Sequence, residues 1–391
     1  MKKILFTLFL LSAAMTSMAF DWKPQPNEKL RTDMIAYAET VLRYAKGSAA
    51  EPIIRDFVAR QKYIADEQPY AWISETHQLV ETLKNMYPPK IDDKYFETQM
   101  RRHALRLLDY PLHVDNRSKD INAAELEAYN QATNTYLANS RKQVLQWLEQ
   151  PAPPQGIVDI CLIYNMGYLI RTSERTFAID IRWAGTEAEA QTIAEHADCI
   201  FVSHPHGDHY TPMLLKAFEQ AGKPVVLPAA TLPGFTPSKP AVVIDNTILT
   251  ARMVAGIEVR CLHGAQEVGV NDSVPNNVYI LTFDGWTMLH QGDNENIPIQ
   301  KKLIDMPVCN LIFAPAWNNI QELLRPAMEA EDADVKPMYF FPTHQNELEH
   351  VVRHRESYWE LFNRKDRMGN PDFKYPPFVL MDNGESFQIS K

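Results

Sequence analysis

Hydrophobic positions in the first third of the chain recur every three to four residues, which is the spacing of one face of a helix. The clearest series consists of five apolar residues: Leu30, Met34, Tyr37, Val41 and Tyr44. Similar patterns predict helices over residues 71–86, 95–108 and 122–148, the second of them ending before Pro111. We therefore expect residues 20–150 to be an all-α region.

The pattern changes after the proline-rich segment 151–156, which breaks helical periodicity and marks a boundary. Beyond it, short apolar runs typical of strands alternate with helical stretches. Strands are expected at 157–164, 168–171, 177–180, 199–202, 224–227, 257–262, 278–283, 286–289, 378–381 and 386–389. Helices are expected at 186–196, 210–220 and 347–363. Residues 157–391 therefore form a predicted α/β domain.

Residues 1–19 have the features of a secretory signal peptide. Lys2 and Lys3 precede the apolar stretch 4–11, and Ser17-Met18-Ala19 fits the small-x-small cleavage rule. The apolar stretch is too short to cross a bilayer comfortably, and no second long apolar run follows. We therefore expect export to a bacterial periplasm or beyond, with no membrane span after the signal is removed.

Length and charge narrow the choice of partners. The 391 residues exceed one ordinary core and suggest two structural units. The formal net charge of −10 argues against nucleic acid as the main partner, because affinity for phosphate backbones comes from dense Lys and Arg. A small-molecule substrate is therefore expected, and the oligomeric state is left open.

The four cysteines do not contribute to a predicted site. They are Cys161, Cys199, Cys261 and Cys309, and all lie in apolar, strand-like surroundings without Cys-x-x-Cys spacing. Disulfides are possible in an exported protein, but small buried thiols are the more economical interpretation.

The strongest chemical signal is the segment His204-Pro205-His206-Gly207-Asp208-His209, which directly follows the apolar run 199–202. It places four potential metal ligands within six residues. Imidazole and carboxylate together suit zinc, iron or manganese, and a tight loop at a strand end holds them with little entropy left to lose. A histidine-rich surface turn without a metal is the alternative. The segment therefore predicts a metal site.

Further candidates follow other apolar runs, at the position where an α/β sheet presents its loops to a ligand. His263 comes after residues 257–262, Asp293 closes residues 286–293, and His344 comes after residues 338–343. Upstream, Asp180 closes the expected strand 177–180. A single histidine after a strand is by itself more often an ordinary loop residue, so the order of the whole series carries the argument.

The series His-x-His-x-Asp-His, followed in order by His263, Asp293 and His344, resembles the signature of the metallo-β-lactamase superfamily. The resemblance covers about residues 157–391. It is closest to the branch of the ascorbate-6-phosphate lactonase, whose Gly-Asp strand end also follows a hairpin like Phe283-Asp284-Gly285. The resemblance implies an αββα sandwich preceded here by the all-α region. The alternation of elements alone would also fit an ordinary doubly wound fold.

The resemblance also implies two bound divalent metal ions, zinc by default, with manganese or iron fitting the same ligands. The implied ligands are His204, His206 and His263 for one ion, Asp208, His209 and His344 for the other, and Asp293 bridging both. A hydroxide shared by the two ions would attack a carbonyl or phosphoryl centre. Asp208 is additionally expected to act in catalysis by helping to hold this hydroxide.

Four nearby residues are weaker candidates. Strand periodicity places residues 289, 291 and 293 on one face and His290 on the other, so His290 is expected to support the site rather than bind metal. Asp180 either orients a ligand or ties down a loop. Arg182 is a candidate for meeting one carboxylate or phosphate of a substrate. Trp317 either lines a substrate pocket or is plain packing.

The loops expected around the metals suggest the substrate class. Residues 229–240, 264–277, 294–298 and 316–320 contain one cation, Lys239, among many Asn, Thr, Pro and Gly. Polyanions are normally met by several Arg or Lys side chains, whereas asparagines suit carbonyl and hydroxyl groups, unless they only shape turns. We therefore expect an exported dinuclear hydrolase of a small ester, lactone or amide.

Two alternatives stay open, namely a phosphodiesterase of the same superfamily and a non-catalytic metal-binding module. A serine hydrolase is not supported, because no Gly-x-Ser-x-Gly motif occurs. The helical region is expected either to shape access to the site or to be a stabilising or dimer-forming appendage.

Overall fold

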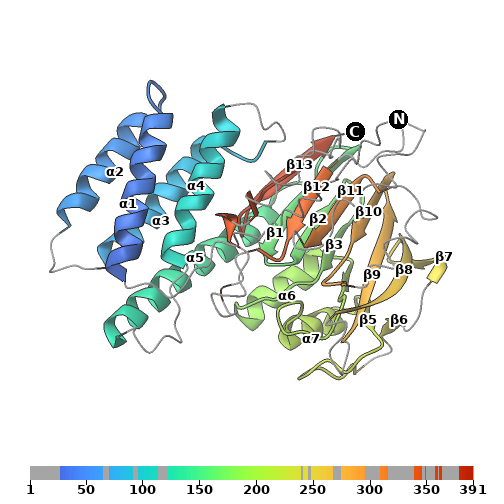
Figure 1. Ribbon diagram of the computed structural model, residues 1–391. Helices are drawn as coiled ribbons and strands as arrows, with labels where there is room; N and C mark the ends of the chain where they lie inside the picture. Colours follow the sequence, from blue (N-terminus) through green and yellow to red (C-terminus); the bar gives the residue numbers. More distant parts are fainter. Residues whose placement is uncertain are drawn as a thin grey trace, which may run out of the picture.

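The chain has a helical bundle on one side and two face-to-face sheets on the other (Figure 1). The computed structural model describes residues 27–64, 70–90, 96–112, 122–238, 241–244, 248–266, 274–295, 309–315, 339–345, 348, 357–359, 361–362 and 378–390. In this part of the chain, no helix is long and apolar enough to cross a membrane.

The bundle consists of α1 (Asn27–Tyr44), α2 (Glu51–Tyr63), α3 (Ala71–Met86), α4 (Phe96–Leu112) and α5 (Ala123–Leu148). The prediction of an all-α region is confirmed, and Leu30, Met34 and Val41 of the predicted stripe are buried. Helix α2 was not predicted. The predicted end of α4 before Pro111 is wrong, because the helix continues to Leu112. Burial of the last turn, including Pro111 itself, offsets the one backbone hydrogen bond that a proline removes.

The first sheet has seven strands in the order β13-β1-β2-β3-β4-β5-β6. Their bounds are β1 Ile157–Tyr164, β2 Gly167–Arg171, β3 Thr176–Ile179, β4 Cys199–Phe201, β5 Val225–Pro228, β6 Val242–Ile244 and β13 Ser386–Ser390. Helices α6 (Glu187–His196) and α7 (Pro212–Gln220) connect its parallel strands, and α7 packs on β4 and β5. The predicted strand 378–381 is reduced to an isolated bridge between Phe378 and Phe340.

The second sheet has six strands in the order β12-β11-β10-β9-β8-β7. Their bounds are β7 Ile248–Val254, β8 Ile257–Gln266, β9 Val274–Phe283, β10 Trp286–His290, β11 Leu311–Pro315 and β12 Tyr339–Thr343. The two sheets with their helices confirm the α/β metallo-β-lactamase sandwich preceded by a helical region. Most of the predicted helix 347–363 lies outside the described residues.

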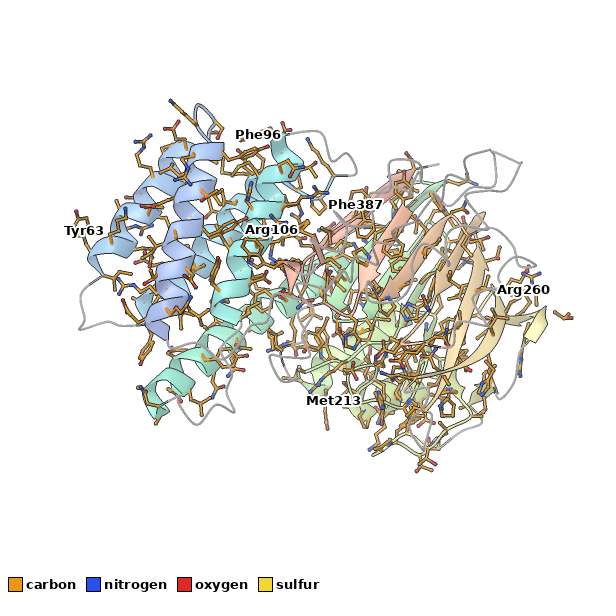
Figure 2. All side chains as sticks on the ribbon, in the orientation of Figure 1. Tyr63, Phe96, Arg106, Met213, Arg260 and Phe387 are labelled. Carbon is orange, nitrogen blue, oxygen red and sulfur yellow. The ribbon has the colours of Figure 1, made fainter. Side chains whose placement is uncertain are left out.

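Two apolar cores hold this arrangement together. Side chains fill the space within the bundle and within the sandwich (Figure 2). One core lies between the sheets, where Tyr168 of β2 meets Phe313 of β11 edge-on with ring centroids 4.7 Å apart. The other runs without interruption from the helical bundle to α6 and α7. All four cysteines are free and buried, in agreement with the prediction. The bundle and the sandwich are therefore packed as one body.

A buried polar cluster also joins the bundle to the turn before β13. Lys84 of α3 donates to Asp382 over 2.5 Å, and the Tyr136 hydroxyl of α5 donates to the same carboxylate over 2.6 Å. Tyr358 donates to Asp382 as well, over 2.9 Å. We call these four residues the Lys84–Asp382 cluster. It fixes α3 and α5 to a segment more than two hundred residues away in the sequence.

Candidate metal centre

The predicted metal-binding loop, residues 204–209, follows β4 in the interior of the seven-stranded sheet. Its turn is closed by a hydrogen bond from the His209 backbone N–H to the His206 carbonyl over 3.1 Å. His204, Asp208 and His209 are buried, whereas His206 is half-buried. A short loop between a central strand and α7 therefore holds three of the four candidate ligands inside the protein.

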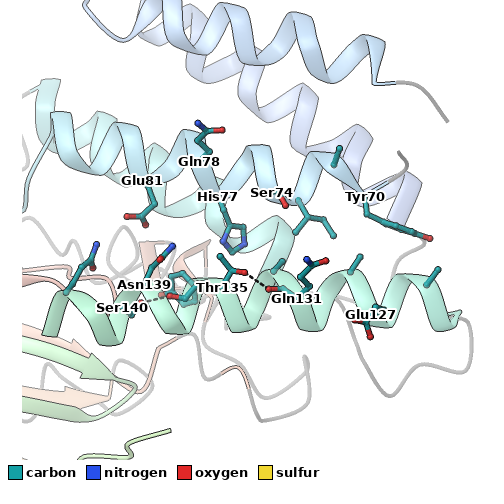
Figure 3. A pocket seen from close by; sticks show the side chains of 17 residues that line it. Tyr70, Ser74, His77, Gln78, Glu81, Glu127, Gln131, Thr135, Asn139 and Ser140 are labelled. Carbon is teal, nitrogen blue, oxygen red and sulfur yellow. Dashed lines mark hydrogen bonds between the residues drawn. The ribbon is translucent and has the colours of Figure 1, made fainter. Parts of the chain in front are cut away.

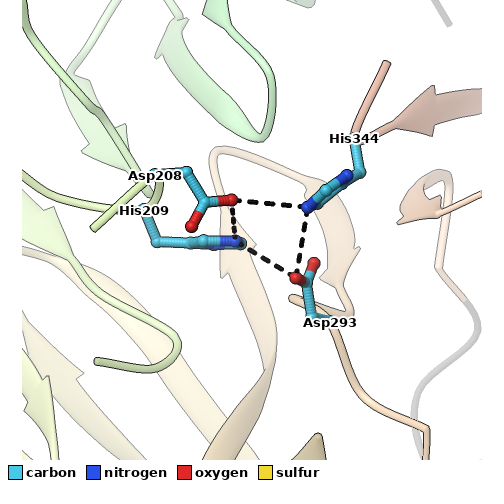
Figure 4. A group of neighbouring side chains, drawn as sticks. All are labelled: Asp208, His209, Asp293 and His344. Carbon is cyan, nitrogen blue, oxygen red and sulfur yellow. Dashed lines mark ion pairs between the residues drawn. The ribbon is translucent and has the colours of Figure 1, made fainter. Parts of the chain in front are cut away.

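Four of the predicted ligands meet at one point (Figure 4). The ligand atoms of Asp208, His209, Asp293 and His344 all lie within 4.8 Å of one another. His344 Nε2 is 3.3 Å from a carboxylate oxygen of Asp208 and 3.3 Å from one of Asp293. His209 Nε2 is 3.1 Å and 3.4 Å from the same two oxygens. Residues from three loops of two different sheets thus converge, and their role as metal ligands stays a prediction.

The three-histidine set predicted for a second ion is only partly assembled. His204 Nε2 lies 3.8 Å from Asp293 Oδ2, and the rings of His204 and His206 are 4.8 Å apart. His263 lies within β8 rather than after it, which corrects the predicted end of this strand, and its Nδ1 is 3.4 Å from the Asn277 amide oxygen. Asp293 thus lies between His204 and the four-residue cluster, and the role of His263 as a ligand stays a prediction.

Asp293 is placed by a tight turn rather than by a strand end. Strand β10 ends at His290, one residue beyond the predicted strand 286–289, so the strand periodicity that was extended to residue 293 does not apply to Asp293. Gly292 between them has φ of +55°, and a Cβ there would lie 2.3 Å from the Asn276 amide oxygen. The same amide oxygen accepts the Asp293 backbone N–H over 3.0 Å. Only glycine allows this close approach, which aims Asp293 at the ligand cluster.

Asp180 contacts the candidate ligand His209 at Nδ1, the ring nitrogen that does not face Asp208 and Asp293. Its carboxylate accepts hydrogen bonds from the backbone N–H of Ser203 over 2.7 Å and from its hydroxyl over 2.6 Å. His209 Nδ1 lies 3.0 Å and His290 Nε2 2.7 Å from the same carboxylate. Asp180 therefore has contacts that fit the orienting role, one of its two predicted alternatives, and His290 is buried against it rather than in the ligand cluster. Such contacts fix the tautomer and direction of a ligating imidazole.

Asn165, in the turn between β1 and β2, was missed by the sequence analysis. Its side-chain amide donates a hydrogen bond to Asp208 Oδ2 over 2.9 Å. Its backbone carbonyl accepts a hydrogen bond from the His344 backbone N–H over 3.3 Å. The residue is fully buried and adopts a left-handed φ of +55°. It therefore touches two predicted ligands from different sheets. A turn asparagine is common for purely local reasons, so the sequence alone carried no signal for this contact.

The charges of the site favour a bound cation. Burial by itself would raise the pKa of Asp208 and of Asp293, but the neighbouring imidazoles of His209 and His344 hold both well below the ordinary value. Burial lowers the pKa of His204 to about 3, which keeps this imidazole neutral with a lone pair for ligation. His204 Nε2 and Asp293 Oδ1 are buried and lack a hydrogen-bond partner in the described structure. Buried orphan acceptors are costly, and a divalent cation with nitrogen and oxygen ligands would satisfy both.

The remaining candidates give a mixed result. Trp317 lies outside the described residues. Arg182 is half-buried and lines a small cavity together with Leu137 and Arg141 of α5, so the helical bundle reaches the segment that follows Asp180.

The expectation that loop asparagines face a substrate is wrong for Asn276 and Asn277. Both are fully buried, and their amides donate to the backbone carbonyls of Gln291 and Ile244.

Comparison with known proteins identifies the domain. Residues 160–344 match the family model described as the beta-lactamase superfamily domain, a range that contains every predicted metal ligand. No curated protein matches the chain significantly.

Similar solved structures include a metallo hydrolase from the archaeon Ignicoccus hospitalis, which is 14% identical with a TM-score of 0.42 over 60% of this chain and 99% of that one. An isothiocyanate hydrolase from Delia radicum gut bacteria is 13% identical, with a TM-score of 0.39 over 59% of this chain and 99% of that one. CmlA, a diiron β-hydroxylase from Streptomyces venezuelae, is 13% identical, with a TM-score of 0.43 over 69% and 58%.

Proposed function

This chain belongs to the metallo-β-lactamase superfamily of metal-dependent hydrolases through residues 160–344, and we propose that it is an exported dinuclear hydrolase of small esters, lactones or amides. The observation that carries the proposal is the position of Asp293. One of its carboxylate oxygens lies between 3.3 and 3.8 Å from the Nε2 atoms of His204, His209 and His344. A carboxylate reached by both predicted ligand sets is placed to bridge two ions.

The residues of the site would have different roles in metal binding and catalysis. Asp208, His209 and His344 would hold one ion, and His204, His206 and His263 the other, with Asp293 shared. Divalent ions held there would supply Lewis-acid chemistry, which lowers the pKa of a bound water towards neutrality and stabilises negative charge on a substrate oxygen. Asp208, kept ionised by its imidazole neighbours, would help to hold the attacking water. Asp180 and Asn165 keep these groups in place.

The proposed substrate class depends on the scarcity of positive charge near the ligands. In the described parts of the predicted substrate loops, residues 229–238, 264–266, 274–277 and 294–295, no Lys or Arg occurs. A polyanion would find few charged donors there. A small ester, lactone or amide with at most one anionic group fits this environment best, and Arg182 is the candidate partner for that group. Zinc is the default ion, and manganese or iron would suit the same ligands.

A substrate screen tests the proposal. The full chain, loaded separately with zinc and manganese, would be assayed against lactones, simple esters, amides, phosphodiesters and oligonucleotides, with Asp208→Asn as the inactive control. We expect hydrolysis in the first three classes. A preference for phosphodiesters would replace this proposal by the phosphodiesterase alternative. Two bound metals without turnover of any class would favour the non-catalytic module.

Export is proposed on the signal-like residues 1–19, and a separate measurement tests it. Mass spectrometry of the protein recovered from the periplasm of a bacterial host should give a mature chain that begins at Phe20. Recovery of the intact chain from the cytoplasm alone would contradict it.

A further inference from the structure

A second pocket lies in the helical bundle, away from the metal ligands (Figure 3). It opens between α3 and α5 and has a volume of about 760 Å³, within the range of small-molecule sites. None of the predicted metal ligands lines it. It also lies outside residues 160–344, so the family assignment gives it no role.

The pocket exists because one face of α5 carries small side chains. Ala124, Ala128 and Ala132 follow one another at a spacing of four residues and face the pocket. Large apolar side chains at these positions would fill the space between the two helices, as they do elsewhere in the bundle. Further along α5, the larger side chains of Val144 and Trp147 are buried in the core. The sequence of α5 therefore keeps a gap open towards α3.

The floor of the pocket contains an unsatisfied polar group. His77 projects from α3 towards α5, and its ring meets the Tyr136 ring edge-on at a centroid distance of 5.8 Å. The Nε2 atom of His77 is buried and has no hydrogen-bond partner in the described structure. The neighbouring Tyr136 hydroxyl donates its hydrogen bond to Asp382. The half-buried His77 ring therefore lines the pocket with hydrogen-bonding capacity that the protein itself does not use fully.

The charges of the residues that line the pocket indicate which ligands it can bind. Among the described residues, no Lys or Arg lines the pocket, whereas two carboxylates do, Glu81 and Glu127. Glu81 is paired with Lys84 over 2.7 Å. Burial lowers the pKa of His77 to about 4, with the Lys84 ammonium acting in the same direction and Asp382 against it, so the imidazole is neutral near pH 7. An anion would therefore meet only neutral or negative groups and is disfavoured.

We propose that this pocket is a binding site for a small uncharged molecule that has a hydroxyl group on a compact apolar body. The apolar body would lie on the alanine face of α5 between the helices. The hydroxyl would hydrogen-bond to the His77 imidazole, which lines the pocket and in its neutral form donates at one ring nitrogen and accepts at the other. This single hydrogen bond, beside an otherwise apolar contact with α5, would give the site its specificity.

Nuclear magnetic resonance of the full chain with ¹⁵N-labelled histidine tests the proposal, with phenol as the probe and benzoate as its anionic counterpart. The His77→Phe variant assigns the His77 signal. We expect phenol to shift this signal saturably with a dissociation constant of about 1 mM or lower, and benzoate to leave it unchanged. Exposed His196 of α6, whose Nδ1 lies 2.8 Å from the Thr192 carbonyl, serves as the reference and should not move.

Two matched variants locate the binding. Ala128→Leu fills the pocket and should weaken phenol binding at least about tenfold, while Ala138→Leu, on the exposed side of α5, should leave it unchanged. Asp208→Asn at the metal centre should also have no effect. Equal shifts of His77 and His196, equal binding in both leucine variants, equal binding of benzoate, or no saturable shift at all would overturn the proposal.

Discussion

Replacing Lys84 with methionine should strongly weaken the contact between the helical bundle and the sandwich. The side chains of Lys84 and Asp382 are 4% and 0% exposed, and their charged atoms lie 2.5 Å apart. Methionine keeps the length of the side chain but leaves the Asp382 carboxylate buried with only neutral donors, chiefly the hydroxyls of Tyr136 and Tyr358. Removing one member of a buried ion pair typically costs about 3–5 kcal/mol, so the free energy of unfolding should fall by about this amount.

Urea unfolding of the full chain at pH 7, followed by circular dichroism, measures this loss. The matched control is Lys29→Met, because Lys29 pairs with Asp33 over 2.7 Å but the two side chains are 56% and 43% exposed. Exposed pairs contribute about 0–1 kcal/mol, so this control should be nearly neutral. Similar losses in the two variants would refute the reasoning, because they would show that burial does not decide the effect.

The pH dependence of the Lys84 variant provides a second check. Burial alone would raise the pKa of Asp382, but the Lys84 ammonium and the donated hydrogen bonds hold it below the ordinary value. A pKa lowered by folding stabilises the protein above the unfolded value of about 3.9, and this stabilisation is lost as the pH falls through the folded value. The difference between wild type and Lys84→Met should therefore shrink below about pH 4. A difference that is constant from pH 7 to pH 3 would contradict the assignment.

Three further predictions concern the site and its support. Asn165→Ala should lower metal affinity about 10–100-fold in a chelator competition with little change in circular dichroism, because Asp208 and His344 lose a common anchor; unchanged affinity would contradict that role. Asp208→Asn should abolish most turnover of an identified substrate while the fold is kept, and near-normal turnover would remove Asp208 from the mechanism. A fragment that begins at Gly156 should be insoluble or unfolded, because it lacks the bundle that covers Asp382; a soluble fragment with native circular dichroism would show that the sandwich folds alone.

The cluster of candidate ligands could be predicted because its members occupy positions that the sequence marks clearly. Four of them are contiguous with an apolar run, and the others follow apolar runs in a fixed order. The fold was predictable for the same reason, since strands β1 and β10 and helix α3 have strong periodicity or clear breaks. Strand ends were less certain, because the continuation of β8 through His263 depends on its pairing with β9.

The supporting residues could not be predicted because their partners are set by tertiary structure. Asn165 reaches Asp208 only because β2, β3 and β4 are neighbours in one sheet. Asn276 was considered for substrate contact from its polarity, yet it is buried and holds the Gly292 turn. Lys84 and Asp382 are separated by 298 residues in the sequence, so no local pattern predicts their pairing. The role of a buried polar residue thus depends on which residues surround it in the fold, and not on its residue type alone.

Metal content tests the central claim most directly. Elemental analysis of the gently purified full chain should give about two equivalents of divalent metal, since two ligand sets share Asp293. Asp293→Ala should retain at most about one equivalent, because its carboxylate lies within reach of His204 as well as of His209 and His344. A single tightly held equivalent that is unchanged in Asp293→Ala would contradict the bridged dinuclear centre.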